Sequence, residues 1–258
     1  MRRLILAAAI LAAIPAVIPA DWLGVPPAQA RAQRFPTLAL EDGAGQAALL
    51  HMPSPDHPAP PIIIILPDSA PHDLRHDRYA EHLLALGFAV LVPQRAPAVI
   101  EGFIRRLRDA PAQGAGQGVG QDGARIGLLA FGAGAAEALR HGPMPRALLY
   151  PGCAQLPGPP DAAPVLLLHG DADPANPPPA CAATARAWRD AGAPVTRHML
   201  RGAGYAWDLE PLGGFRQALL PAPGMERRVR VIPDPAITEQ AADMVAQFFR
   251  GLLGERGS

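Results

Sequence analysis

The segment Arg125–Leu139, RIGLLAFGAGAAEAL, decides how the rest of the chain is interpreted. Within it, Ile126–Phe131 is a short apolar run that predicts a buried strand, and Gly132 and Gly134 permit a sharp reversal. The residues from Ala135 onward predict a helix. A strand, a tight glycine turn and a helix together form a nucleophile elbow, whose motif reads G-x-S-x-G. Here the central position of the motif is Gly132, so the apex of the turn has no side chain.

Composition limits the size and the partners of the protein. A chain of 258 residues, of which 49% are hydrophobic, can bury one large core or at most two small ones. The 23 basic residues, all of them arginine, balance 23 acidic residues, so the formal net charge is zero. Such a balance gives no indication of a polyanionic partner, and we expect no binding to nucleic acid.

The N-terminus has the features of a signal peptide. Arg2 and Arg3 are followed by the apolar run Leu4–Ile18, and Ala28-Gln29-Ala30 provides an A-x-A cleavage site. The alternative is a membrane anchor. The apolar run is interrupted by Pro15, however, and is shorter than the roughly 20 residues that span a bilayer. We therefore expect residues 1–30 to be removed, without a stable membrane span afterwards, and the mature protein to be periplasmic or secreted.

The chain has two cysteines, Cys153 and Cys181. In an oxidising compartment they could pair and close a loop of about 27 residues, which stabilises a fold by roughly 3 kcal/mol. Two buried free thiols are the alternative, but an exported chain favours the disulfide. A metal site would need more ligands than this pair supplies.

Residues 31–258 alternate between strand-like and helix-like segments and show no second domain. The expected strands are Gln46–Met52, Ile62–Leu66, Phe88–Val92, Ile126–Phe131, Ala147–Tyr150, Val165–His169 and Val195–Leu200. The expected helices are Arg78–Leu86, Ala98–Asp109, the elbow helix, Ala180–Ala191 and Ala236–Leu252, with irregular segments at Pro111–Gly123 and Asp208–Asp234. Alternation of this kind predicts an α/β fold, in which a mostly parallel twisted sheet is covered by helices on both faces.

Marked sequences follow four of the expected strands. They are Leu66–Ser69, the turn at Gly132, His169–Asp173 and Gly202–Asp208. Functional groups of parallel sheets lie at the carboxyl ends of the strands, so we expect these four loops to meet.

Three of these loops resemble the dienelactone hydrolase family of α/β-hydrolases, over roughly Pro61–Phe249. The family's elbow, G-F-S/C-x-G-G, aligns with Ala130–Ala135. Its acid loop, H-G-x-x-D, aligns with His169–Asp173, and its base loop, G-A-G-H-x-F, aligns with Gly202–Trp207. The resemblance implies an α/β-hydrolase fold with a Ser/Cys–His–Asp triad at these loops.

Two of the three implied triad positions are substituted. Gly132 stands at the nucleophile position and has no atom that could form an acyl-enzyme. Tyr205 stands at the histidine position, and its phenol, with a reference pKa of about 10, is a poor base at neutral pH. The acid position is retained as Asp173. We therefore expect a catalytically degenerate protein that keeps a cleft for binding or has a structural role.

A catalytically degenerate protein of this kind should have a particular binding site. The missing side chain of Gly132 would leave a small space, lined by Asp173 and Tyr205, for a compact polar small molecule. The alternative function is an ester or lactone hydrolase with a displaced nucleophile such as Ser69, near His72 in the expected oxyanion loop. Ala133 would contribute the other oxyanion donor through its backbone N–H.

Two further motifs suggest cofactors but are weak. His72 and His76 have the i, i+4 spacing of metal ligands, yet arginines flank them, and a solvated helix start explains the pattern. The Gly132-x-Gly134 turn resembles a dinucleotide-binding loop, but its third glycine position is Glu137. We therefore expect neither a metal nor another cofactor.

Overall fold

The computed structural model describes residues 35–42, 44–53, 60–68, 75–94, 100–109, 125–159, 161–209 and 218–254. The expected signal peptide, residues 1–30, and the expected irregular segment Pro111–Gly123 lie outside these ranges. In the ranges that are described, no helix is both long enough and apolar enough to cross a membrane.

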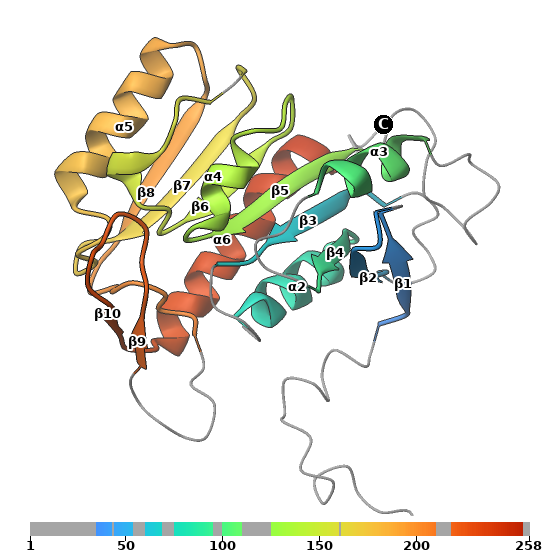
Figure 1. The fold of residues 1–258 in the computed structure, drawn as a ribbon, viewed down its shortest axis with the longest axis horizontal. Coiled ribbons are helices and arrows are strands. Elements are labelled where there is room, and N and C mark those ends of the chain that lie inside the picture. The colour runs from blue at the N-terminus through green and yellow to red at the C-terminus, as the bar shows by residue number, and fades with distance from the viewer. Residues whose placement is uncertain are drawn as a thin grey trace, which may run out of the picture. The chain divides into compact units, whose positions relative to one another are not determined.

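An eight-stranded sheet forms the centre of the fold (Figure 1). Its strands are β1 (Thr37–Glu41), β2 (Ala47–His51), β3 (Ile62–Leu66), β4 (Ala89–Pro93), β5 (Ile126–Phe131), β6 (Arg146–Leu149), β7 (Val165–Gly170) and β8 (Val195–Leu200). Their spatial order is β1-β2-β4-β3-β5-β6-β7-β8. Only the pairings β1–β2 and β2–β4 are antiparallel, so the prediction of a mostly parallel sheet is confirmed.

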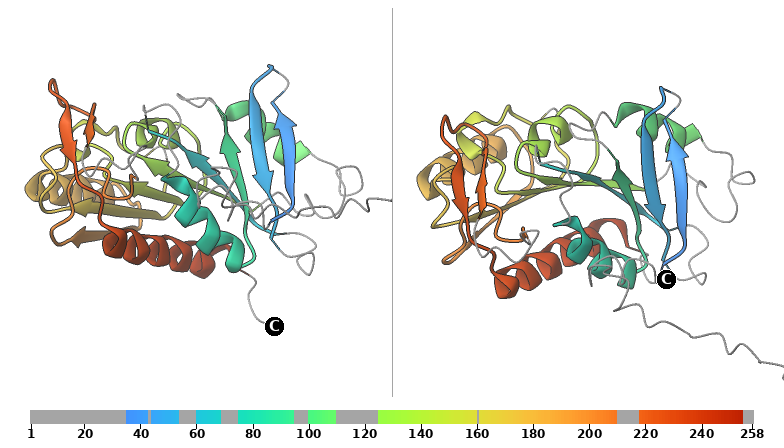
Figure 2. Two further views of the ribbon diagram at one scale, coloured as in Figure 1. Left: turned by 90° about the horizontal axis from the view of Figure 1, so that it is seen from below. Right: turned by 60° about the horizontal axis from the view of Figure 1, so that its bottom comes forward.

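Helices cover both faces of this sheet (Figure 2). One face carries α2 (His76–Ala85) and α6 (Pro235–Leu253), and the other carries α3 (Glu101–Asp109), α4 (Gly134–Ala138) and α5 (Pro178–Asp190). Because strand side chains alternate between faces, the apolar runs of the central strands fill two separate cores. Continuous apolar runs such as IIIIL in β3 are therefore what a two-sided parallel sheet requires.

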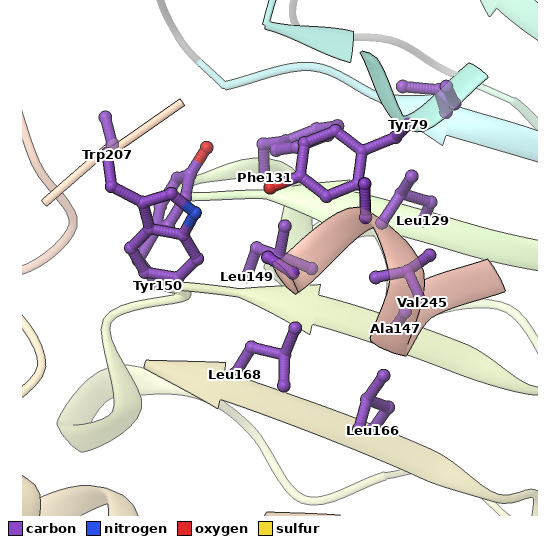
Figure 3. Packing of buried hydrophobic residues seen from close by; sticks show 14 of the residues in the cluster. Tyr79, Leu129, Phe131, Ala147, Leu149, Tyr150, Leu166, Leu168, Trp207 and Val245 are labelled. Atoms are coloured by element: carbon purple, nitrogen blue, oxygen red, sulfur yellow. The ribbon is translucent and has the colours of Figure 1, made fainter. Parts of the chain in front are cut away.

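The core beneath α2 and α6 extends to the site described below (Figure 3). Leu129, Leu149 and Leu166 face Val245 of α6, whereas Phe131 and Tyr150 lie nearer the carboxyl ends of β5 and β6. The aromatic end of this core thus adjoins the edge of the sheet where the marked loops emerge.

Two features of the fold differ from the expectations. Strand β1 was not predicted, and the segment Asp208–Asp234, expected to be irregular, contains an antiparallel hairpin of β9 (Ala218–Leu220) and β10 (Val229–Val231). Each hairpin strand has three residues, and too few apolar positions alternate there to distinguish a strand from a loop.

The expected disulfide is present. Cys153, in the short 3-10 helix η2 (Cys153–Gln155), is bonded to Cys181 of α5, and both side chains are buried. The bond attaches the loop after β6 to the helix after β7. It also removes Cys153 as a nucleophile.

Candidate functional site

The strand–turn–helix elbow has the predicted geometry. Gly132 follows β5 with a φ of +47°, in the left-handed region, and its N–H donates to the carbonyl of Leu149 at 3.0 Å. Helix α4 starts at Gly134, where a Cβ would lie 2.7 Å from the carbonyl oxygens of Leu66 and Pro67. Gly134 therefore lets the elbow approach the end of β3 closely.

The space beside Gly132 is filled. A Cβ built on Gly132 would lie 2.5 Å from the carboxyl carbon of Asp68 and 2.5 Å from the Tyr205 hydroxyl. Both side chains are buried, with exposed fractions of 1% and 0%. The expectation that Gly132 leaves a small space for a ligand is therefore wrong. The Asp68 carboxyl, just after β3, fills that space, and no motif in the sequence predicts this contact.

Asp68 is the hub of an elbow cluster that consists of Asp68, Gly132, Ala133 and Tyr205. Its Oδ1 accepts the backbone N–H of Ala133 at 3.0 Å, and its Oδ2 accepts the Tyr205 hydroxyl at 2.6 Å. In a nucleophile elbow, the N–H after the apex residue is a donor to the substrate oxyanion. In this protein the acceptor of that N–H is a carboxylate of the chain itself.

Arg75 connects the elbow cluster to a second buried carboxylate. Its Nη1 lies 3.4 Å from Asp68 Oδ2 and donates to the Tyr150 hydroxyl at 3.0 Å. The Tyr150 and Tyr79 hydroxyls each donate to one oxygen of Asp208, both at 2.7 Å. This arrangement of Arg75, Tyr79, Tyr150 and Asp208, here called the tyrosine network, gives both oxygens of Asp208 a hydrogen-bond donor.

Aromatic rings enclose the tyrosine network. The Tyr150 ring makes edge contacts with Trp207, at 4.7 Å between centroids, and with Tyr205, at 5.2 Å. Figure 3 shows Trp207 beside Tyr150, with Phe131 and Tyr79 on the adjoining side. Tyr150 has a φ of +40°, which is uncommon for a residue with a side chain. The Tyr150 side chain is fully buried among these rings.

Two of the three tyrosines that donate to carboxylates, Tyr205 and Tyr79, have a raised pKa and remain protonated. Burial, and then the charge of Asp68, raises the pKa of Tyr205 far above its ordinary value. Burial, followed by the charge of Asp208, similarly raises the pKa of Tyr79. Tyr205 is therefore a hydrogen-bond donor and not a proton acceptor near neutral pH. This agrees with the poor basicity inferred from its residue type.

Asp173, at the retained acid position, is held by its own loop. Its Oδ1 accepts the N–H of Ala175 and its Oδ2 accepts the side-chain amide of Asn176, both at 2.8 Å. Burial raises the pKa of Asp173 to about 6, although these hydrogen bonds oppose the shift. The charge of Asp173 adds slightly to the raised pKa of Tyr205, so the two groups are within electrostatic range of each other.

Asn176 was missed by the sequence analysis. Its side-chain oxygen accepts the N–H groups of Gly152 at 2.8 Å and Cys153 at 3.2 Å. The residue is fully buried and joins the acid loop to the loop after β6. Its signal in the sequence was its position three residues after an aspartate at a strand end.

The acid and base loops lie against each other. A Cβ on Gly170 would lie 1.9 Å from the carbonyl oxygen of Ala203, and that oxygen accepts the N–H of Ala172 at 3.1 Å. Asp171 Oδ1 accepts the N–H of Gly202 at 2.6 Å. The structure thus brings Gly132, Asp173 and Tyr205 to one edge of the sheet.

The remaining candidates are not part of the elbow cluster. His169 is buried, its Nδ1 faces the Gly170 carbonyl at 3.1 Å, and Arg197 Nη1 lies 2.6 Å from its Nε2. Burial lowers the pKa of His169, so its imidazole is neutral near neutral pH. Ser69 and His72, the alternative catalytic pair, lie outside the described residues. Within those residues, no group of three or more potential ligands could hold a metal ion.

The sequence matches no family model and no curated protein, but similar structures have been solved. Thermogutta terrifontis esterase 2, phosphoramylated by tabun, has a TM-score of 0.61 and 13% identity, covering 86% of this chain and 97% of its own. A dienelactone hydrolase-like promiscuous phosphotriesterase from metagenomic libraries has a TM-score of 0.58 and 20% identity, covering 85% and 98%. Pyrobaculum calidifontis esterase has a TM-score of 0.58 and 12% identity, covering 88% and 90%.

Proposed function

We propose that this chain, which has an α/β-hydrolase fold, is a degenerate, non-hydrolytic relative of the dienelactone hydrolases. It uses the fold for a structural or binding role. The observation that carries the proposal is the position of the Asp68 carboxyl. It lies where a nucleophile's side chain would project from Gly132, and it accepts the Ala133 N–H that an oxyanion would need.

Each step of acyl transfer lacks a component at this site. No atom at Gly132 can attack a carbonyl carbon, and Tyr205 donates its proton to Asp68 in a hydrogen bond instead of accepting one. A substrate carbonyl that approached Ala133 would meet the negative charge of Asp68. In a serine protease, loss of the nucleophile or the base alone costs on the order of a millionfold in turnover.

The proposal includes export. The features that support it are the signal-peptide pattern of residues 1–30 and the buried Cys153–Cys181 disulfide, because disulfides persist in oxidising compartments. Residues 31–258 would then form the mature protein as a single domain.

The test is hydrolysis of p-nitrophenyl acetate by the purified full chain. We expect a rate equal to that of the Asp190→Asn variant and to that of the heat-denatured protein. Asp190 lies on the exposed side of α5, so this variant is a matched surface control. Turnover that is lost in a Ser69→Ala variant would instead support hydrolysis by a displaced nucleophile, and the proposal would be wrong.

A converse experiment tests whether only the chemistry has been lost. The variant Asp68→Gly/Gly132→Ser/Tyr205→His restores a nucleophile and a base and also removes the carboxyl that fills their space. The double variant without Asp68→Gly is the matched control, because its serine would still collide with Asp68. Activity in the triple variant alone would support Asp68 as the group that blocks the site.

A further inference from the structure

The β9–β10 hairpin has one buried and one outward face. Val229 and Val231 are buried in the core, with exposed fractions of 5% and 0%. Arg230 pairs with Leu219 across the hairpin, and both side chains are exposed. Because side chains alternate along a strand, Arg228 and Ile232 share the outward face with this pair. The views in Figures 1 and 2 place the hairpin at the opposite end of the sheet from β1.

Apolar exposure is concentrated on this hairpin. Leu219 and Ile232 are 60% and 54% exposed, the highest values among the large apolar side chains in the part of the chain that is described. Met225, in the turn between the two strands, is also exposed. Large apolar side chains that are grouped and exposed indicate a contact surface, whereas isolated ones need no explanation.

The same hairpin is basic although the whole chain has no net charge. Arg227, Arg228 and Arg230 are exposed, and Glu226 is the only acidic residue between residues 218 and 232. Arg228 Nη1 donates to the carbonyl of Leu219 at 3.1 Å. Across the described ranges, none of these three arginines forms an ion pair with a carboxylate.

We propose that the outward face of the hairpin, Leu219, Arg228, Arg230 and Ile232, binds the surface of an anionic lipid bilayer. The arginines fit lipid phosphates, and the apolar side chains fit the boundary between headgroups and acyl chains. An acidic polypeptide would satisfy the arginines but would leave Leu219 and Ile232 facing charge. The bilayer satisfies both parts of the surface, and this proposal does not depend on whether the elbow is catalytic.

The test is flotation of the purified mature protein, residues 31–258, with vesicles, so that the apolar N-terminal segment does not contribute to binding. We expect binding to vesicles of phosphatidylglycerol and phosphatidylcholine, weakening as salt is raised, and little binding to phosphatidylcholine alone. The variant Arg228→Gln/Arg230→Gln should bind roughly 30-fold more weakly, since each arginine contributes about a factor of five at such a surface. Leu219→Ser/Ile232→Ser should weaken binding as well.

The control variants carry the same kinds of substitution elsewhere on the surface. Arg105→Gln/Arg108→Gln on α3 and Leu38→Ser on β1 alter exposed residues far from the hairpin and should bind as the parent does. Absence of binding, equal binding to both vesicle types, or equal loss in hairpin and control variants would overturn the proposal. Capture of a fluorescent polyglutamate without vesicle binding would also overturn it, in favour of an acidic polypeptide.

Discussion

The elbow cluster and the acid loop lie at the same edge of the sheet but differ in what has been kept. The acid loop keeps its carboxylate, Asp173, with two hydrogen-bond donors from its own loop. The elbow has the backbone conformation of a nucleophile elbow but no reactive side chain. Gly132 has a positive φ, and Gly134 lies close to the end of β3. In the elbow, another carboxylate and a phenol fill the place of reactive atoms. In this structure the elbow is a packing and hydrogen-bonding surface for Asp68 and Tyr205.

The largest effect should come from Asp68→Ala, which tests whether the elbow has become structural. The substitution leaves the Ala133 N–H and the Tyr205 hydroxyl without their acceptor and removes a buried partner of Arg75. We expect the free energy of unfolding to fall by about 3–5 kcal/mol. Urea denaturation measures the change, and Asp190→Asn should stay within about 0.5 kcal/mol of the parent. Equal stability of both variants would contradict a structural role of Asp68.

Gly132→Ala should cost about 3 kcal/mol, because a Cβ adds a left-handed backbone penalty to a collision with Asp68 and Tyr205. The matched control is Gly202→Ala, at a φ of +76° with no atom within 4 Å of the added Cβ. That control should lose only the backbone part, about 1 kcal/mol. If the two variants lose the same stability in urea denaturation, the space beside Gly132 is open.

The acid loop should make the free energy of unfolding depend on pH through Asp173. The pKa of Asp173 is raised from 3.8 to about 6, so the native state holds this proton more tightly than the unfolded chain does. Its contribution is therefore complete below pH 3.8 and is lost as the pH rises through 6, by up to about 3 kcal/mol. Urea midpoints across this range should fall less steeply for Asp173→Asn than for the parent. Parallel curves would contradict the raised pKa.

Tyr205→Phe should have the smallest effect of these changes. It removes one charge-assisted hydrogen bond to Asp68 and keeps the ring, so we expect a loss of about 2 kcal/mol. A double-mutant cycle with Asp68→Ala measures the coupling, which should exceed 1 kcal/mol by a rough estimate. Additive losses would show that the hydroxyl and the carboxylate do not interact.

Much of the fold could be predicted from local sequence. Strands β3, β5 and β8 have the predicted bounds. Strands β3 and β5 are apolar runs of five and six residues, whereas β8 (VTRHML) is mixed and begins directly after Pro194. Strand β1 and the β9–β10 hairpin were missed. Their side chains are mostly exposed or the strands are very short, so tertiary contacts determine them.

The sequence motifs indicated positions in the site but not their interactions. The three motifs fall on Gly132, Asp173 and Tyr205, which lie at one edge of the sheet. The role of Asp68 depends on how closely the ends of β3 and β5 approach, and no spacing along the chain encodes that distance. The same holds for Asp208. It accepts hydrogen bonds from Tyr150 and Tyr79, which are separated from it in the sequence by 58 and 129 residues.

The central claim is that the elbow has no nucleophile and that its oxyanion donor already has an internal acceptor. Intact mass spectrometry of the full chain after treatment with a fluorophosphonate tests it most directly, with the Asp68→Gly/Gly132→Ser/Tyr205→His variant treated in parallel. We expect an unchanged mass for the parent protein, and an adduct in the variant would show that the reagent can reach the elbow. A stoichiometric phosphonyl adduct on the parent would instead show that the native chain carries a reactive nucleophile.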